Sequence, residues 1–310
     1  MQIKYSRKIY TVEEAFDELE SIFSDKQIEL INVTNTDLIF HIKIPCRTSW
    51  YVDPDIEELS QNELKQLPEF YLLKESKHKI FLKTYFHYNA LIAADRYEKV
   101  SGNKIGCIIH FDDHSDMMPI YKKREESFTY KEKIRNGELA IGNFITNYLI
   151  KNCIDIYHIQ NSLSLGFCED RFNYSIRENE VTIGDTQFEK IEIRKTKLLS
   201  NTYYRMDLNS FNNTEIEYEN IWLDIDLDYF CNRFNRNSDW KEIKYFDKTL
   251  DELKLDIEIF LENIINWDWV KKVKVLTVAS SPGFFPIEYM DYIETNLIIE
   301  LQKVMGFGSI

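Results

Sequence analysis

Carboxylates and imidazoles concentrate in one short stretch of the sequence, directly after an apolar run. Asp112, His114 and Asp116 occupy alternate positions there. In an extended backbone, residues two positions apart point to the same side, so these three side chains are expected to converge on one point. Asp113 and Ser115 would then face away from that point.

A second acidic stretch follows another apolar run, much further along the chain. Asp224 and Asp226 share one side of an extended backbone, and Asp228 joins them if the strand continues. The two stretches together predict the two halves of one site. His110 lies inside the first apolar run, where we expect it to pack or to form a hydrogen bond with a residue of that site.

Carboxylates at this density repel one another, and burying them without compensation is costly. A divalent cation removes that cost. Mixed carboxylate and imidazole ligands suit Mn²⁺, Fe²⁺ or Zn²⁺, and the excess of carboxylates favours Mn²⁺. Two ions could share one carboxylate, and a water between them loses a proton near neutral pH. The alternative is that the acids are polar strand ends or helix caps, which is the usual meaning of a single Asp-x-Asp.

The surrounding elements predict an α/β fold. Strands are expected over residues 104–112, 154–160, 221–226 and 272–280. Helices are expected over residues 87–100, 138–152, 249–267 and 287–305. This alternation predicts βαβ units and a parallel sheet that is covered on both faces. Ligands bind at the carboxyl ends of such strands, where both acidic stretches lie.

Residues 1–80 have a different pattern, with a helix over 11–23 followed by strand-like runs. We expect them to form a small strand-rich N-terminal extension or subdomain, packed on a core domain of residues 81–310. Such an extension could bind the leader segment of a peptide by strand addition, or it could be purely structural.

Composition limits the classes of function. The chain has 310 residues, of which 44% are hydrophobic, enough for a sizeable core. A net charge of −14 argues against nucleic-acid binding, which needs a basic surface. Five scattered cysteines without a CxxC motif are typical of a reduced, cytoplasmic protein. The sequence lacks an apolar signal-peptide region and an apolar run of membrane-spanning length, so we expect no membrane partner.

The two acidic stretches resemble the Asp-x-His-x-Asp and Asp-x-Asp motifs of the arginase and ureohydrolase superfamily, in the same order. The resemblance implies a three-layer α/β/α sandwich with a mostly parallel sheet and a binuclear manganese centre, with two Mn²⁺ per chain. It also implies an upstream histidine ligand, for which His87 at the start of a predicted helix is the candidate. The implied metal ligands are His87, Asp112, His114, Asp116, Asp224 and Asp226.

A divergent branch of this superfamily is more closely similar, over roughly residues 80–305. The matching segments are HFDDHSD (110–116), IGNF (141–144), LDIDLDYF (223–230) and SPGFF (281–285). Some bacterial members are peptide arginases, which convert arginine side chains of ribosomally made peptides to ornithine and urea. The resemblance therefore implies an arginine-containing peptide as substrate, with a precursor peptide as the candidate.

The resemblance also suggests roles within such a reaction. Asp112 or Asp224 would bridge the two ions. Asp228 would take the departing proton or orient the attacking hydroxide, and a structural role is the alternative. Asn143 in the IGNF segment would line the pocket, although asparagine at such a position also caps or turns a chain.

The sequence departs from arginases that act on free arginine. Those enzymes bind the guanidinium with an acidic residue near the end of the last strand, where this chain has Ala279 or Ser280. Asp228, Glu138 or Glu288 could replace it, or the substrate is not arginine. The histidine that shuttles protons in those arginases has no clear counterpart in this chain either, since His158 lies too far along to assign.

Two other functions remain open. Zinc deacylases share this fold but carry a His-His dyad before the metal strand and use one metal ion. The corresponding segment FHYN (86–89) lacks the dyad, which disfavours that class. A non-catalytic metal-binding protein is the third candidate.

Overall fold

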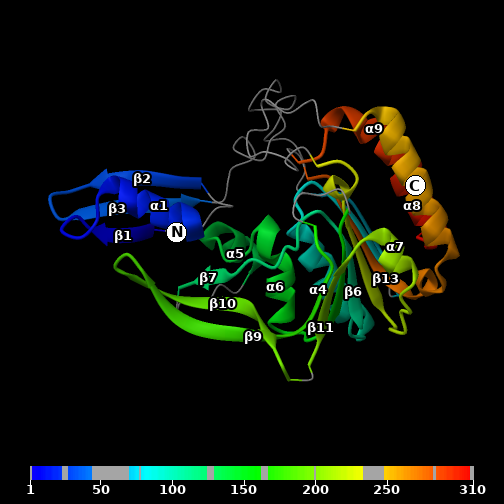
Figure 1. Cartoon of the computed structure of the whole chain (residues 1–310), viewed down its shortest axis with the longest axis horizontal. Coiled ribbons are helices and arrows are strands. Elements are labelled where there is room, and N and C mark those ends of the chain that lie inside the picture. The colour runs from blue at the N-terminus through cyan, green and yellow to red at the C-terminus, as the bar shows by residue number, and fades with distance from the viewer. Residues whose placement is uncertain are drawn as a thin grey trace. The chain divides into compact units, whose positions relative to one another are not determined.

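The structure is a computed structural model (Figure 1), and it describes residues 2–22, 27–43, 70–76, 78–123, 129–161, 167–198, 200–232, 248–281 and 284–307. The chain forms two compact units, each assembled from separate stretches of sequence. Unit 1 comprises Met1–Trp50, Asp116–Lys151 and Ser175–Arg194. Unit 2 comprises Tyr51–Ser115, Asn152–Tyr174 and Lys195–Ile310.

A large sheet dominates the described residues. It has ten strands in the order β4-β5-β13-β12-β6-β8-β11-β9-β10-β7. The strands from β5 to β11 in this order are parallel to their neighbours, whereas β4 and β9 pair antiparallel with β5 and β11, and β7 pairs antiparallel with β10. Their bounds are β4 Phe70–Glu75, β5 Ile80–Thr84, β6 Cys107–Phe111, β7 Ile120–Lys122, β8 Asp155–Ile159, β9 Asp170–Ile183, β10 Thr186–Thr196, β11 Thr202–Met206, β12 Ile221–Asp226 and β13 Val273–Ala279. The prediction of an α/β fold with a mostly parallel sheet is confirmed.

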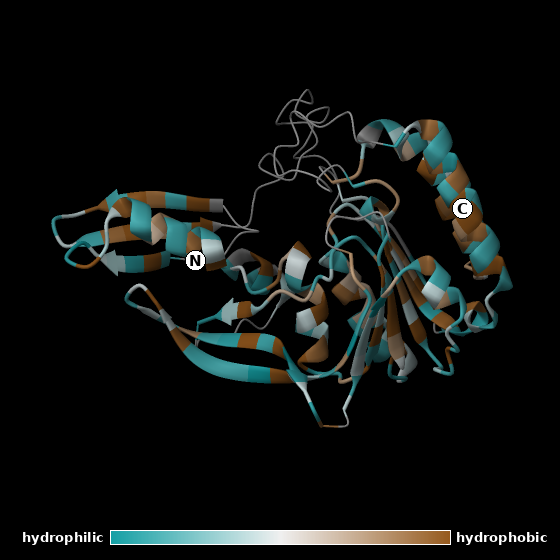
Figure 2. Cartoon of the chain, in the orientation of Figure 1, coloured by the Kyte–Doolittle hydropathy of each residue, from teal (hydrophilic) through white to brown (hydrophobic). Residues whose placement is uncertain are grey.

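The central strands are apolar because they are covered on both faces. Every residue of β6 and of β12 is buried. Hydrophobic bands follow the strands of this sheet, whereas the long strands β9 and β10 are largely hydrophilic (Figure 2). The four predicted strands therefore correspond to β6, β8, β12 and β13, each within a few residues of its expected bounds.

The helices of the described residues are α1 Val12–Ile22, α4 Asn89–Ser101, α5 Tyr130–Asn136, α6 Phe144–Leu149, α7 Leu208–Asn212, α8 Leu250–Asn266, α9 Met290–Tyr292 and α10 Ile299–Val304. Short 3₁₀ turns are η1 Ile141–Asn143, η2 Leu227–Tyr229, η5 Asp268–Lys272 and η6 Ile287–Tyr289, and η7 Ile293–Ile298 is a π-helix. None of the helices in the described ranges combines the length and apolarity that a bilayer crossing requires.

Local signals explain where α8 begins. The Thr249 side chain accepts from the backbone N–H of Glu252, and the Glu252 side chain accepts in return from the backbone of Thr249. This capping box satisfies N–H groups that the first turn leaves without partners. Leu253, Ile257 and Phe260 recur at helical spacing on the buried side.

Two predicted helices are less regular than expected. The helix expected over 138–152 begins only at η1, because Ala140 is extended and its N–H donates to the Asn143 side chain instead of continuing a helix. The helix expected over 287–305 is divided into η6, α9, η7 and α10. Hydrophobic spacing alone does not distinguish an α-helix from one that contains a π turn.

The N-terminal part of unit 1 has its own small sheet. Its three described strands, β1 Gln2–Ser6, β2 Gln27–Val33 and β3 Asp37–Lys43, are antiparallel in the order β1-β3-β2. Tyr5, Leu19 and Phe40 are fully buried there, in one core cluster with Phe188 of β10. The predicted helix and strands of this region are confirmed.

An aromatic cluster in unit 2 supports the end of β6, directly before Asp112. The ring of Phe111 packs edge-on against Phe211, Tyr229 and Phe260, with ring centroids 5.8, 5.3 and 5.0 Å away. Tyr229 directly follows Asp228, so this one ring fixes both acidic strand ends.

Replacing Phe111 by alanine should therefore lower the free energy of unfolding by about 3–5 kcal/mol, because a buried aromatic side chain leaves a cavity. Urea unfolding followed by circular dichroism measures the change. The matched control is Ile265→Ala on α8, whose side chain is 63% exposed, and it should change stability by about 0.5 kcal/mol or less. Equal losses in the two variants would contradict this account of the strand end.

Candidate metal centre

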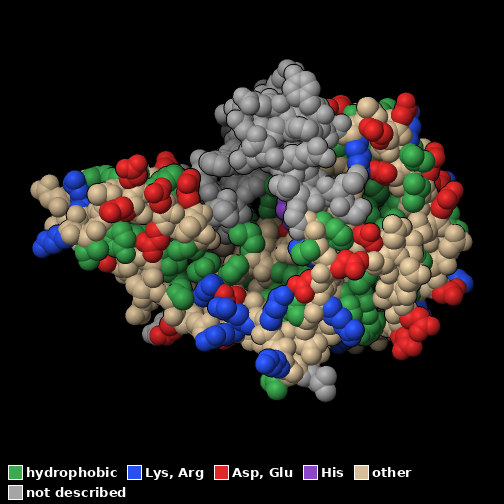
Figure 3. Space-filling model, viewed as in Figure 1, with side chains coloured by type: hydrophobic (Ala, Val, Ile, Leu, Met, Phe, Trp, Pro, Cys, Tyr) green, Lys and Arg blue, Asp and Glu red, His purple; other side chains and the backbone are tan. Residues whose placement is uncertain are grey.

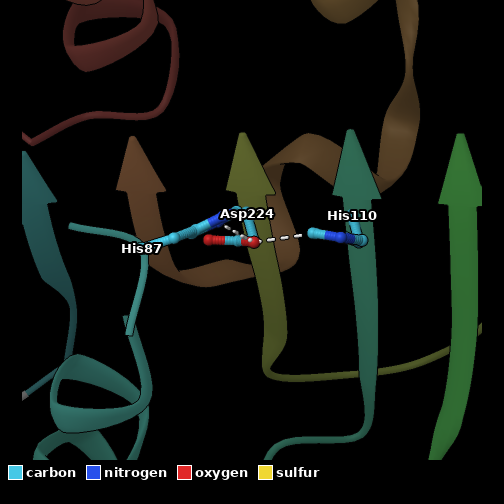
Figure 4. Close-up of side chains that lie close together, drawn as sticks. All are labelled: His87, His110 and Asp224. Carbon is cyan, nitrogen blue, oxygen red and sulfur yellow. Dashed lines mark hydrogen bonds and ion pairs between the residues drawn. The ribbon is translucent and has the colours of Figure 1, made fainter. Parts of the chain in front are cut away.

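Buried histidine and aspartate side chains meet at the carboxyl ends of β6 and β12, which are adjacent parallel strands. Asp224 of β12 lies opposite His110 of β6 in the sheet register. His87 reaches the same point from the turn between β5 and α4, and Figure 4 shows the two imidazoles on either side of Asp224. All three side chains are almost wholly buried. The chain thus brings together residues that lie far apart in the sequence.

Asp224 is held by three groups. Its Oδ2 lies 2.7 Å from Nε2 of His87 and 2.8 Å from Nδ1 of His110. Its Oδ1 accepts a hydrogen bond from the hydroxyl of Thr277 on β13. Burial by itself raises the pKa of this carboxyl, but the two imidazoles outweigh it and lower the pKa to about 2.

The other ring nitrogen of His87 faces two more carboxylates. Nδ1 lies 3.0 Å from Oδ2 of Asp226 and 3.3 Å from Oδ2 of Asp112. Ser281 donates its hydroxyl to Oδ2 of Asp226 from the segment after β13. One imidazole therefore touches three buried carboxylates.

His114 and Asp228 form the outer part of the cluster. Nδ1 of His114 lies 2.9 Å from Oδ2 of Asp228 and 3.5 Å from Oδ1 of Asp112. Burial lowers the pKa of His114, but the charges of Asp228 and Asp112 outweigh it and hold the pKa well above its usual value. Burial, together with the charges of Asp226 and Asp112, raises the pKa of Asp228 well above its usual value.

His158, which could not be assigned from the sequence, supports Asp112 from β8. Its Nε2 lies 3.0 Å from the carbonyl of Asp112, and its Nδ1 lies 2.6 Å from the hydroxyl of Tyr203. Burial and the nearby imidazole of His110 lower the pKa of His158 to about 3, so the ring is neutral. Nε2–H therefore donates to the carbonyl, and Nδ1 accepts from Tyr203.

The backbone around the first motif is not extended as predicted. It bends at Asp113 and His114, because the N–H of His114 donates to Oδ1 of Asp112 at 2.6 Å. Asp113 also forms hydrogen bonds with its buried surroundings. Its buried carboxylate accepts from Asn232 at 2.7 Å, and its N–H donates to Asp228. The bend still leaves Asp112 and His114 on the same cluster.

The structure brings together most of the predicted ligands. Ligand atoms lie within 4.8 Å of one another in three groups of unit 2: His87, His110 and Asp224; His87, Asp112 and Asp226; and Asp112, His114 and Asp228. Asp116 begins the second stretch of unit 1, where it is buried with a φ of 50°. Its role as a ligand stays a prediction.

Asn143 and two of the three candidates for guanidinium binding do not belong to this cluster. Asn143 is buried in unit 1, where its side chain accepts from Ala140 and donates to the carbonyl of Glu138, as in a residue that turns the chain. Glu138 itself is buried in unit 1, and Glu288 is exposed in η6. Of the three candidates for guanidinium binding, Asp228 is the one that belongs to the cluster.

The donor set fits divalent cations. Both ring nitrogens of His110 face acceptors, the Asp224 carboxylate and the carbonyl of His114, 2.8 and 3.1 Å away. A neutral imidazole has one N–H and cannot donate to both. Among the described residues, Oδ2 of Asp112 is fully buried and accepts no hydrogen bond. The three groups contain four carboxylates and three imidazoles, and a divalent ion would compensate the excess of carboxylates.

Comparisons with known proteins give no further guide. The chain matches no protein-family model, and no curated protein is significantly similar to it in sequence.

Sequence reasoning missed the hydroxyl groups that support the carboxylates. Thr277 donates to Asp224 and accepts from the indole N–H of Trp222 at 2.8 Å. Replacing Thr277 by valine should lower the free energy of unfolding by about 1–3 kcal/mol, because it leaves a buried indole N–H and a carboxylate oxygen without that partner. Thermal and urea unfolding measure the loss.

Thr295→Val is the matched control, because Thr295 is exposed and its hydroxyl bonds only locally, to the carbonyls of Asp291 and Tyr292 and to the side chain of Asn296. It should change stability by about 0.5 kcal/mol or less. A Thr277 variant as stable as this control would show that the hydroxyl does not hold Asp224.

Proposed function

We propose that the chain is a binuclear manganese-dependent hydrolase, a peptide arginase that converts arginine side chains in a peptide to ornithine and urea. The observation that carries this proposal is the convergence of Asp112, Asp224 and Asp226 on His87 at the ends of adjacent parallel strands. The proposal includes the arginase-like three-layer α/β/α sandwich, two Mn²⁺ per chain, a cytoplasmic location and a precursor peptide as substrate.

The ligand groups support a pair of ions. Asp112 belongs both to the group with His87 and Asp226 and to the group with His114 and Asp228. A carboxylate shared between two groups is the arrangement expected of a bridging ligand. This favours Asp112 over Asp224 as the bridge, since the latter is held by His87, His110 and a hydroxyl.

Divalent ions, when bound, would supply a nucleophilic water near neutral pH for attack on the planar guanidinium carbon. Asp228 has the environment of a proton carrier, because burial and two neighbouring carboxylates raise its pKa. Its proton would go to the departing ornithine nitrogen. His114 orients Asp228 from the partly exposed side of the cluster, since its own side chain is 45% exposed.

A deacylase of the same fold is the second candidate. The observation that favours it is the end of β13, where Ala279 and Ser280 are buried and uncharged. A neutral acyl amide would need no anion at that position, whereas a guanidinium would. A metal-binding protein without catalytic activity is the third candidate.

Metal content distinguishes these functions. The purified chain should take up two Mn²⁺, measured by plasma mass spectrometry after dialysis, and Mn²⁺ should raise its melting temperature because ions bind the folded state. Asp226→Asn should lose at least one ion, whereas the exposed Asp291→Asn should keep both. One Zn²⁺ per chain would favour the deacylase, and no bound ion would exclude both enzymes.

The proposed reaction is tested by measuring the mass of the peptide and the release of urea. Manganese-loaded protein, incubated with an arginine-containing peptide, should remove one CH₂N₂ unit from the peptide and release urea. Asp226→Asn should slow this by at least about 100-fold, since ligand loss disables metal-assisted hydrolysis. Asp291→Asn should act like the unmodified chain. Full activity in Asp226→Asn would refute the metal assignment, and acyl release without urea would indicate the deacylase.

A further inference from the structure

A polar cavity of unit 2 lies near the candidate metal centre, at the same edge of the sheet. It has a volume of about 160 Å³ and is formed by segments that follow β8, β11 and β12 together with one side of α8. We call it the acidic pocket, and its defining residues are Asn161, Asp207, Tyr229, Phe230, Asp256 and Ile259. A cavity of about 150 Å³ accommodates a ring the size of benzene, so one side-chain head group fits here.

The acidic pocket offers negative charge. Oδ1 of Asp207 accepts from the backbone N–H of Ser210 at 2.8 Å, as the N-cap of α7. Asp256 pairs with Lys248 through Oδ2. Of the described residues that line the pocket, none is a lysine or an arginine. Acidic side chains are also scattered over the face of the molecule that Figure 3 shows.

Tyr229 gives an independent sign of a ligand. Its side chain is 7% exposed and lines the pocket, and among the described residues its hydroxyl forms no hydrogen bond. The accessible part of this side chain opens on the pocket, so its hydroxyl can form a hydrogen bond with a ligand there. Burial raises the pKa of Tyr229, and the charges of Asp256 and Asp207 raise it further, so the phenol stays protonated beside both carboxylates.

Aromatic walls and carboxylates together select a planar cation. A guanidinium stacks on rings such as Tyr229, Phe230 and Phe260 and binds carboxylates through paired N–H donors. Lys248 already compensates Asp256, so a cation would mainly compensate Asp207, whereas an anion would be repelled. An ammonium group meets the same charge requirement but stacks less well.

The acidic pocket is connected to the metal centre through the chain. Tyr229 directly follows Asp228, and Gln160 at the pocket wall donates to the carbonyl of Asp113 at 2.9 Å. We propose that this pocket is a specificity subsite that binds the guanidinium of a second arginine of the substrate. The identity of the ligand as a peptide rests on the proposed function; the cation site itself does not.

Calorimetric titration with propylguanidinium tests the site directly. The unmodified chain should bind it at one site, and Asp207→Asn and Asp256→Asn should each weaken binding about tenfold, since each removes a charge-assisted hydrogen bond. Asparagine still caps a helix, so Asp207→Asn should keep α7 folded. Circular dichroism verifies the fold of each variant. Asp251→Asn is the control, because Asp251 lies on the same helix with its side chain 92% exposed.

The metal-site variant separates this inference from the proposed function. Propylguanidinium binding should persist in Asp226→Asn. Binding that is lost in Asp226→Asn but kept in the two pocket variants would place the cation at the metal centre and overturn the pocket, as would absence of binding in the unmodified chain. If the pocket binds the cation while no peptide releases urea, the subsite stands and the arginase proposal fails.

A peptide series then tests the role in specificity. If urea release is observed, replacing the second arginine of a two-arginine peptide by norleucine should raise KM about tenfold with little change in kcat, because the lost contact lies outside the reacting group. Asp256→Asn should erase this preference, and Asp251→Asn should keep it. Equal KM values for both peptides with the unmodified chain would overturn the specificity role.

Discussion

The central constraint on this molecule is the burial of several carboxylates around one imidazole. His87 lies within 3.3 Å of Asp112, Asp224 and Asp226, and all four side chains are almost wholly removed from water. Such a cluster costs free energy unless positive charge and hydrogen bonds compensate it. Much of the local structure supplies that compensation. The hydroxyl of Thr277 on β13 donates to Asp224, and the hydroxyl of Ser281 after β13 donates to Asp226. His110 is a further hydrogen-bond partner of Asp224.

The apolar core on which β6 and β12 pack supplies the stability needed to bury these charges. Phe111 and the aromatic residues around it form a close-packed layer in which rings meet edge to face. Apolar burial there contributes the favourable free energy that the charged edge does not. This division explains why β6 and β12 begin with apolar residues and become polar toward their carboxyl ends.

Much of this arrangement follows from the sequence, and what does not has identifiable reasons. The buried strands were predictable because their apolar runs are too short for helices, and α8 because Thr249 and Glu252 mark its start. The bend after Asp112 was not, since a side-chain acceptor competes locally with extended backbone. Thr277 and Ser281 are ordinary residues until the register places Thr277 beside Asp224. His110 forms a hydrogen bond with Asp224, which is one of the two roles expected of it.

Exposure divides the cluster into an inner and an outer part. His87 and His110 are buried, whereas 45% of the His114 side chain is accessible and its ring lies 5.2 Å from that of Phe284. A ligand that approaches His114 from water therefore meets this imidazole before it meets the buried Asp228 behind it. Asp228 also shares the turn η2 with Tyr229, whose ring packs on Phe111. Asp228, the proton carrier of the proposed reaction, is thus held by the outer histidine on one side and by the aromatic layer on the other.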